Sequence, residues 1–282
     1  MNSIFCRTLK ALCTLVVVGM FSAFGSSSTV DPFTPTRVIG LGDGFNDAAA
    51  TVRETGSTTG TVVEQVAAYF GQSNVLSYAV GGARVADLGA QITAAGSFSA
   101  NDLVVIAIGT FDVKAGATPA TEAQTLVEQV RRLKSAGATH ILIMPVLDVS
   151  RTPWGRTHPN LVSATATNTF NDAILTALSA EFGGQSENTV IYANASGVTS
   201  LFLTATSTTS YSPFTDTGFD GASATTPACG NPNAFAGCDA SVPTGANRPY
   251  TTMLFADGIH LTPVGNRWVA QYLYNATGQG WR

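Results

Sequence analysis

The run DLVVIAI, from Asp102 to Ile108, constrains the fold of this chain more than any other stretch. Successive side chains of a strand point to opposite faces of its sheet, so an uninterrupted apolar run predicts a strand buried on both faces. Such a strand belongs in the middle of a sheet that other elements cover. The run ends abruptly at Gly109, where we expect a turn.

The segments on either side of this run alternate between strand and helix patterns. Helices are expected at about 61–70, 121–136 and 164–182, and strands at about 75–80, 140–146 and 189–193. Pro263 can open a last helix, because proline is favoured in the first helical turn. Strict alternation of strand and helix predicts an α/β fold with a parallel sheet covered on both faces.

A polar turn bounded by glycines ends the first apolar run, in the segment RVIGLGDGFND at 37–47. The run stops at Gly42, Asp43 and Gly44. Ligands and catalytic groups collect at the carboxyl ends of the strands in an α/β sheet. Asp43 alone is typical of a turn residue, but its position makes this turn the first place where we expect chemistry.

Three further features belong to the same edge of the predicted sheet. Gly81 and Gly82 follow the second expected strand, and Gly109 follows the third. Asp257 and His260 lie just before the last helix. Each alone has an ordinary interpretation, as a tight turn or a structural histidine. Their common edge is what indicates a site.

The N-terminus has the pattern of a secretory signal peptide. Arg7 and Lys10 precede an apolar stretch that is too short to span a bilayer comfortably as a helix. Small residues favour cleavage after Gly25, so we expect a signal peptide at 1–25 and a single domain at 26–282. The protein is then exported to the periplasm or the medium, without a stable transmembrane anchor.

The charge of the chain excludes one class of partner. The full chain has 14 basic and 18 acidic residues, a net charge of −4, and cleavage removes two basic residues, which leaves 12 against 18, or −6. We do not expect such an acidic chain to bind nucleic acid. The mature chain of 257 residues (282 minus 25) fits one large α/β domain.

The cysteines indicate a small disulfide loop. Cys6 and Cys13 leave with the signal peptide, and most of the apolar stretch follows Cys13, which disfavours it as a lipid-attachment site. Cys229 and Cys238 remain, in a stretch at about 204–248 rich in Ser, Thr, Gly, Pro and Asn that we expect to pass over the active edge of the sheet. Two thiols are too few for a metal site, so we expect a disulfide and no metal.

These motifs together resemble the SGNH/GDSL hydrolase family, particularly its secreted bacterial esterases and phospholipase-like members. The resemblance runs from about Val38 to the C-terminus. It rests on GDGFND at 42–47, YAVGGAR at 78–84, GTFD at 109–112 and DGIHLTPVGN at 257–266. It implies a three-layer sandwich with a central parallel sheet, the flavodoxin-like fold of the family, and hydrolysis of carboxylic esters without metal or cofactor.

The resemblance also implies roles for individual residues. Gly82 would supply a backbone N–H to the oxyanion, and Asp257 would orient the imidazole. His260, with its ring facing the Gly44 turn, would act as general base. The other matched motif positions are Gly42, Asp43, Gly109 and Asp112.

The chain departs from the family at two functional positions. The nucleophilic serine of the family is Gly44 here, which keeps a backbone N–H for the oxyanion but has no side chain. The asparagine whose amide donates to the oxyanion is Phe111. Because both groups act directly on the reacting ester, ordinary serine-esterase turnover is not expected.

Three functions are compatible with these residues. The first is an ester hydrolase that keeps some activity through direct attack by water or through another nucleophile such as Thr110. The second is a protein that binds a lipid or an acetylated carbohydrate without turnover, and the third is an inert exported structural protein. The Asp257–His260 pair argues mildly for the first two, and the missing nucleophile favours the second.

We predict that Cys229 and Cys238 are bridged, because they are close in the sequence and export places them in an oxidising compartment. A loop of this size should add roughly 2 to 3 kcal/mol to the free energy of unfolding. Mass spectrometry of the unreduced mature protein should find neither thiol free, and two free thiols would contradict the prediction.

Overall fold

The computed structural model describes residues 32–49, 60–183, 189–193, 226–229, 253–279 and 281. The chain divides into two units, Met1–Pro32 and Phe33–Arg282, and all elements below belong to the second. The predicted signal peptide, Cys238 and most of the stretch at 204–248 lie outside the described residues. Within the described part, no helix is long and apolar enough to cross a membrane.

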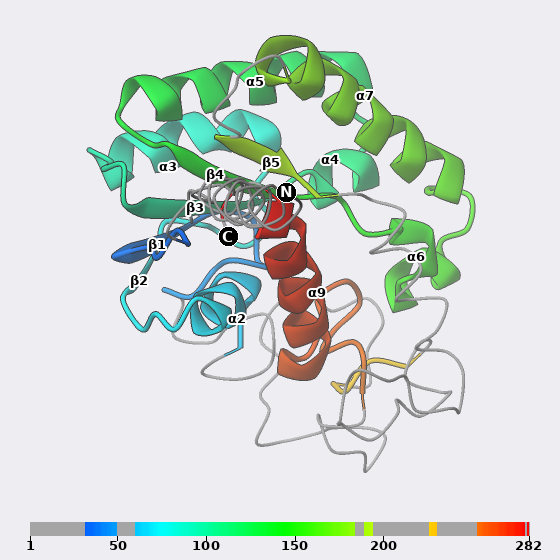
Figure 1. Ribbon diagram of the computed structural model, residues 1–282. Coiled ribbons are helices and arrows are strands. Elements are labelled where there is room, and N and C mark those ends of the chain that lie inside the picture. The colour runs from blue at the N-terminus through cyan, green and yellow to red at the C-terminus, as the bar shows by residue number, and fades with distance from the viewer. Residues whose placement is uncertain are drawn as a thin grey trace, which may run out of the picture. The chain divides into compact units, whose positions relative to one another are not determined.

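Five parallel strands form a central sheet in the order β2-β1-β3-β4-β5 (Figure 1). They are β1 (Arg37–Gly42), β2 (Val75–Ser77), β3 (Asp102–Ala107), β4 (His140–Met144) and β5 (Val190–Tyr192). This 2-1-3-4-5 order is the flavodoxin-like one. The predicted α/β fold with a central parallel sheet is therefore confirmed.

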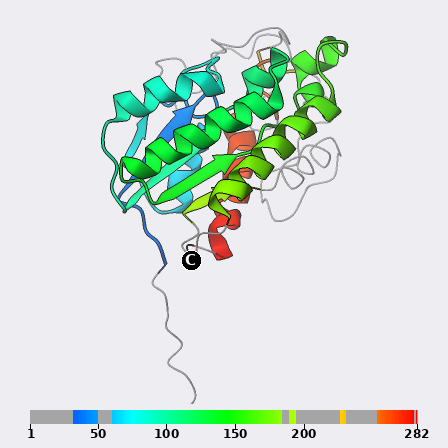
Figure 2. The ribbon, with the colours of Figure 1, turned by 90° about the horizontal axis from the view of Figure 1, so that it is seen from above.

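Helices cover both faces of the sheet. Figure 2 shows α3 (Leu88–Ala95), α5 (Pro119–Ser135) and α7 (Ala164–Phe182) side by side on one face, while α2 (Val62–Tyr69) and α9 (Pro263–Ala276) lie together on the other (Figure 1). The remaining described elements are short: α4 (Thr110–Lys114), α6 (Pro153–Thr157), η1 (Val85–Asp87), η2 (Val149–Arg151) and η5 (Thr277–Gln279).

The central strand β3 sets the register of the sheet. All six of its residues are buried, as its apolar sequence predicts. Its partner β1 runs in parallel from Arg37 beside Asp102 to Gly42 beside Ala107. At the amino edge Arg37 Nε donates to Asp102 Oδ1 over 3.0 Å. This register brings the carboxyl ends of β1 and β3 together at the opposite edge, where the glycine turns begin.

A capping threonine fixes where α9 begins. Thr262 Oγ1 accepts a hydrogen bond from Gly265 N at 3.3 Å, and the same hydroxyl donates to Met253 O at 2.8 Å. Pro263 occupies the first helical turn, as the sequence predicts. The start of α9 is thereby held in place just after His260.

The structure corrects the sequence prediction at several short elements. The second strand ends at Ser77, although Tyr78 N and Val80 N still donate to Gly40 O and Gly42 O. GTFD is not a simple turn, because Thr110 begins the helix α4. The helices α3, α4 and α6 were not predicted, because segments of five to eight residues owe their helical state to tertiary packing.

An aromatic cluster joins the two ends of the second unit to the amino edge of the sheet. The Phe33 ring stacks on His140 of β4, with ring centroids 3.5 Å apart. Trp281 contacts both rings edge-on, at 5.8 and 5.0 Å. Phe33 N also donates to Trp281 O over 2.7 Å. The cluster therefore holds both ends of this unit on β4.

We predict that Trp281→Ala lowers the free energy of unfolding by about 3 kcal/mol, because it empties a buried aromatic site. Urea unfolding of the purified protein measures the loss. Leu161→Ala is the control, since Leu161 is 62% exposed and should change stability by no more than about 0.5 kcal/mol. Equal effects of the two substitutions would show that the cluster contributes nothing specific.

Candidate active site

The candidate site lies at the carboxyl edge of the sheet, where four segments from distant parts of the sequence meet. The turn after β1 is joined to the turn after β2, because Gly81 N donates to Asp47 Oδ2 at 3.2 Å. The segment after β2 is joined to α4, because Val85 N donates to Asp112 Oδ2 at 3.1 Å. The fourth segment is the turn before α9, which carries His260.

Asp257 and His260 form a buried hydrogen-bonded pair. His260 Nδ1 lies 2.8 Å from Asp257 Oδ2, and the two side chains are 1% and 0% exposed. An ionised carboxylate can only accept, so Nδ1 carries the proton and Nε2 is left to act as a base. Asp257 Oδ1 also accepts from Ile259 N and His260 N, at 2.7 and 2.6 Å. The carboxylate therefore shapes the turn and orients the imidazole.

Two phenyl rings contact the imidazole. The Phe45 ring, which follows Gly44 in the chain, has its centroid 5.1 Å from that of His260. The Phe111 ring lies at 5.9 Å. The Phe45 contact brings the imidazole to the turn that carries Gly44. Phe111 presents a hydrocarbon ring at the position where the family resemblance implies an amide. The imidazole therefore has two aromatic neighbours.

The turn after β1 continues the sheet pairing and then closes on itself. Asp43 N donates to Ala107 O at 2.8 Å, and Asp43 Oδ1 accepts from Phe45 N at 3.2 Å. Gly42 has φ +115°, and a Cβ there would lie 1.8 Å from Ala107 O, so only glycine fits. Gly44 is buried in this turn.

The turn after β2 is exposed and presents Gly82 at the edge of the site. Gly82 has φ +77°, a conformation that favours glycine, and a Cβ there would meet open space. Ala83 N donates to Val80 O at 3.0 Å and closes the turn. This arrangement leaves room for a ligand beside Gly82, whose N–H the family resemblance assigns to the oxyanion.

The third motif lies at the start of α4. Gly109 precedes the helix with φ +108°, and Thr110 is 4% exposed. Phe111 is half-buried and contacts the dyad, while Asp112 is buried and binds η1 through Val85 N. The motif therefore keeps its backbone frame, although the amide of the family is missing.

The short helix α6 supports the turn before α9 from outside. Trp154 N donates to Gly258 O at 2.9 Å, and the Trp154 ring is buried between Lys114 and His158. The segment at 226–229 also contacts this turn, because Cys229 N donates to Ala256 O at 3.1 Å. The dyad is thus held by segments that the sequence does not connect to it.

Two amide side chains at this edge were missed by sequence reasoning. Asn46 Nδ2 donates to Leu41 O and Val105 O, at 2.9 and 3.0 Å, and ties the turn to β1 and β3. Gln91 of α3 bonds both backbone groups of Gly42. The available signal was a polar residue on an otherwise apolar helix face, because Gln91 is buried beside Leu88 and Ile92.

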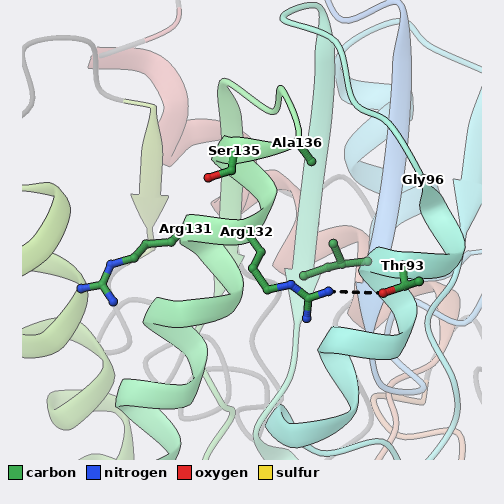
Figure 3. A pocket seen from close by; sticks show the side chains of 7 residues that line it. Thr93, Gly96, Arg131, Arg132, Ser135 and Ala136 are labelled. Atoms are coloured by element: carbon green, nitrogen blue, oxygen red, sulfur yellow. Dashed lines mark hydrogen bonds between the residues drawn. The ribbon is translucent and has the colours of Figure 1, made fainter.

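A separate pocket of about 430 Å³ lies between the C-terminal ends of α3 and α5, away from this edge (Figure 3). Figure 3 shows Arg132 pointing toward Thr93 and Arg131 pointing away from it. Arg132 donates to Thr93 Oγ1 at 3.2 Å, and Arg131 pairs with Glu181 at 2.7 Å. Its cations are engaged within the fold. No group of three or more potential metal ligands occurs among the described residues.

Asp112 makes the stability of this edge depend on pH. Burial raises the pKa of its carboxyl from 3.8 to about 6, against the lowering effect of the Val85 hydrogen bond. Because the folded-state pKa is above the unfolded one, the folded protein loses stability as pH rises through this interval. The loss is complete above about pH 6 and absent below about pH 4.

We predict that Asp112→Asn raises the free energy of unfolding at pH 8 by about 1 to 2 kcal/mol, because it removes the buried negative charge of Asp112. The asparagine oxygen can still accept from Val85 N. The difference from the parent in urea unfolding should grow from pH 4 to pH 6 and then stay constant. A constant difference for Asp112→Asn at every pH would refute this account.

Comparison with known proteins places this geometry in a family. A sequence model of the GDSL-like lipase/acylhydrolase family matches residues 23–184, which is 162 of 282 residues. The match includes Gly44, Gly82 and Phe111, and Asp257 and His260 lie beyond it. No curated protein matches significantly.

Solved structures share the fold at low sequence identity. A protein assigned as a GDSL-like lipase from Parabacteroides merdae is 14% identical with a TM-score of 0.54, over 88% of this chain and 99% of its own. A protein assigned as an SGNH hydrolase from Slackia heliotrinireducens is 18% identical with a TM-score of 0.50, over 86% of this chain and 100% of its own. The sequence match and the common fold show that this chain belongs to the GDSL-like lipase/acylhydrolase family.

Proposed function

We propose that this chain is an exported member of the family that binds a small ester and has greatly reduced or absent serine-esterase turnover. One observation carries the proposal. The Asp257–His260 pair has the arrangement of an orienting acid and a general base, with 2.8 Å between Oδ2 and Nδ1, while Gly44 offers no hydroxyl for the base to activate. The base is retained and its nucleophile is not.

The size of the expected loss favours binding over turnover. Removing the serine of a hydrolase triad costs on the order of 10⁶ in turnover, although ~10³ to 10⁴ over water can survive through binding and the oxyanion hole. Losing one oxyanion donor costs roughly 10² to 10³. The two losses need not multiply, but the missing serine alone is enough to remove ordinary serine-esterase turnover.

The surroundings of the dyad indicate which part of a ligand would lie there. The half-buried Phe111 ring lies with its centroid 5.9 Å from that of the imidazole and is the apolar side chain that a ligand could contact there, while the buried Phe45 ring packs behind at 5.1 Å. The backbone N–H groups of Gly44 and Gly82 are the remaining candidates to bind a carbonyl oxygen. A small ester with an apolar acyl group, from a lipid or an acetylated carbohydrate, fits this combination. Nucleic acid does not.

A second candidate function is slow hydrolysis without an acyl-enzyme. His260 would remove a proton from a water molecule in the space that the family's serine occupies, and that water would attack the ester carbonyl directly. Thr110 is the alternative nucleophile, and its burial at 4% exposure makes it a poor one. An inert structural protein is the third candidate. The buried Asp257–His260 pair argues mildly against it, because such a pair has little structural use.

Export and the disulfide belong to the same proposal. The signal peptide at 1–25 would direct the chain to the periplasm or the medium, where Cys229 and Cys238 can be oxidised. Cys229 N already bonds Ala256 O, next to Asp257. The disulfide would therefore close its loop beside the turn that carries the dyad.

A panel of short-chain and long-chain acyl esters tests the proposal. The mature protein and His260→Ala are compared for hydrolysis, and non-hydrolysable ether analogues of the same compounds are titrated by calorimetry. Binding without turnover supports the proposal. Turnover that His260→Ala abolishes supports the second candidate, and neither binding nor turnover on any member of the panel supports the third.

We predict that Gly44→Ser creates or greatly raises esterase activity, because it supplies a hydroxyl at the position where the family resemblance places the nucleophile. Adding Phe111→Asn should raise it further, since an oxyanion donor is worth about 3 to 4 kcal/mol when its geometry is right. Initial rates on short-chain aryl esters measure both steps. If the Phe111 ring shields the new serine, only the double variant will respond.

Two controls accompany this prediction. Gly44→Ser with Phe111→Leu reduces the ring without supplying an amide, so it separates steric relief from oxyanion stabilisation. His260→Ala should abolish the activity of every active variant. A folded double variant with the rate of the parent, unaffected by His260→Ala, would mean that no catalytic geometry survives at this edge.

A further inference from the structure

A buried glutamine of α3 pairs with both backbone groups of Gly42 at the end of β1. Gly42 N donates to Gln91 Oε1 at 2.7 Å, and Gln91 Nε2 donates to Gly42 O at 2.8 Å. Gln91 is 5% exposed. A side-chain amide thus makes the two hydrogen bonds that a neighbouring strand would make.

The pairing occurs where the ladder between β1 and β2 has ended. That ladder extends from Val38 to Gly40 on β1, so Gly42 lies beyond it. Gly42 O also accepts from Val80 N at 3.0 Å. The Gly42 carbonyl therefore links the turn after β1 to the turn after β2, and Gln91 bonds to that same carbonyl.

The two turns carry the backbone amides that could still bind a developing oxyanion. Gly44 follows Gly42 by two residues, and Gly82 follows Val80 by two residues. Since Phe111 supplies no side-chain amide, no third donor of the family pattern remains at that position. The distance between the two backbone N–H groups then decides how well this edge holds an oxygen anion.

We infer that Gln91 is a positioning residue that sets the spacing of the Gly44 and Gly82 amides through the Gly42 carbonyl. This inference rests on the proposed function, because it assigns the two amides to the ligand-binding edge. A displacement of about 1 Å at such donors commonly costs ~10- to 100-fold in reaction rate. The effect should therefore appear in reactivity at position 44.

The chain offers a matched control in Asn171 of α7. Its Oδ1 accepts from Val146 N and its Nδ2 donates to Val146 O, both at 2.9 Å, and it is 3% exposed. Like Gln91, it is a buried side-chain amide paired with both backbone groups of a residue near a strand end. Its partner follows β4, and its amide makes no described hydrogen bond to either of the two glycine turns.

The first arm of the test uses the Gly44→Ser background and a fluorophosphonate probe. In this reaction the serine oxygen bonds to phosphorus, fluoride leaves, and His260 takes the serine proton. Gln91→Met, which keeps the side-chain volume but not the hydrogen bonds, should slow labelling at least about tenfold. Asn171→Leu should leave the rate within about twofold, although it loses three hydrogen bonds, the two to Val146 and one that Tyr192 Oη donates to Asn171 Oδ1 at 2.9 Å.

The second arm does not depend on reactivity at position 44. In the protein with its own Gly44, ¹⁵N-labelled samples report the amide chemical shifts of Gly44 and Gly82. Gln91→Met should shift both amides, and Asn171→Leu should shift neither. Gln91→Glu keeps the acceptor for Gly42 N and loses the donor to Gly42 O, so it serves where Gln91→Met fails to fold.

The outcomes separate this inference from the proposed function. Equal labelling rates for the Gln91 and Asn171 variants would overturn the positioning role and leave the proposed function intact. If Gly44→Ser is not labelled at all, the labelling rates cannot be compared, the ester panel still decides the proposed function, and the amide shifts decide the role of Gln91. In that case, a Gln91 variant that changes the amide chemical shift of Gly42 but not those of Gly44 and Gly82 would overturn the positioning role.

Discussion

The close approach of β1 and β3 at their carboxyl ends is the constraint on which the site depends. Gly42 has φ +115°, and a Cβ there would lie 1.8 Å from Ala107 O, so only glycine lets β1 end beside β3 in this conformation. Asp43 N continues the pairing by donating to Ala107 O. The chain can leave β1 only after this contact, and position 44 is therefore fixed relative to the sheet.

Side chains that bond to backbone groups hold the neighbouring loops to that fixed turn. Asn46 bonds two carbonyls of the sheet, Asp47 bonds the turn after β2, and Asp112 bonds η1. The bonds of Asp47 and Asp112 satisfy backbone N–H groups outside the sheet, and those of Asn46 tie the turn to carbonyls of β1 and β3. None of them uses a side chain at position 44 or 111. The hydrogen bonds that hold this edge are therefore independent of which side chains stand at positions 44 and 111.

The sequence predicts the elements whose pattern is long and continuous. β3 and α7 lie where the apolar run and the helical spacing predict them. Burial on both faces makes every residue of β3 after Asp102 apolar, and amphipathic packing gives α7 a regular helical spacing of apolar residues. The helix α4 could not be predicted in this way, since five residues are too few to show a helical spacing of apolar residues. The Asp257–His260 spacing was visible, but the contact of Phe111 with His260 joins residues 149 positions apart (260 minus 111). Only the fold reveals it.

The two members of the dyad differ in what their retention means. Asp257 accepts two backbone N–H groups, from Ile259 and His260, and so has a structural use whether or not the site reacts. Any aromatic ring could pack against Phe45 and Phe111 as the imidazole does. What an imidazole adds is a hydrogen bond to Asp257 through Nδ1, and Nε2 is then the nitrogen that could act as a base. The proposal that this edge binds an ester therefore rests on the side chain of His260 rather than on that of Asp257.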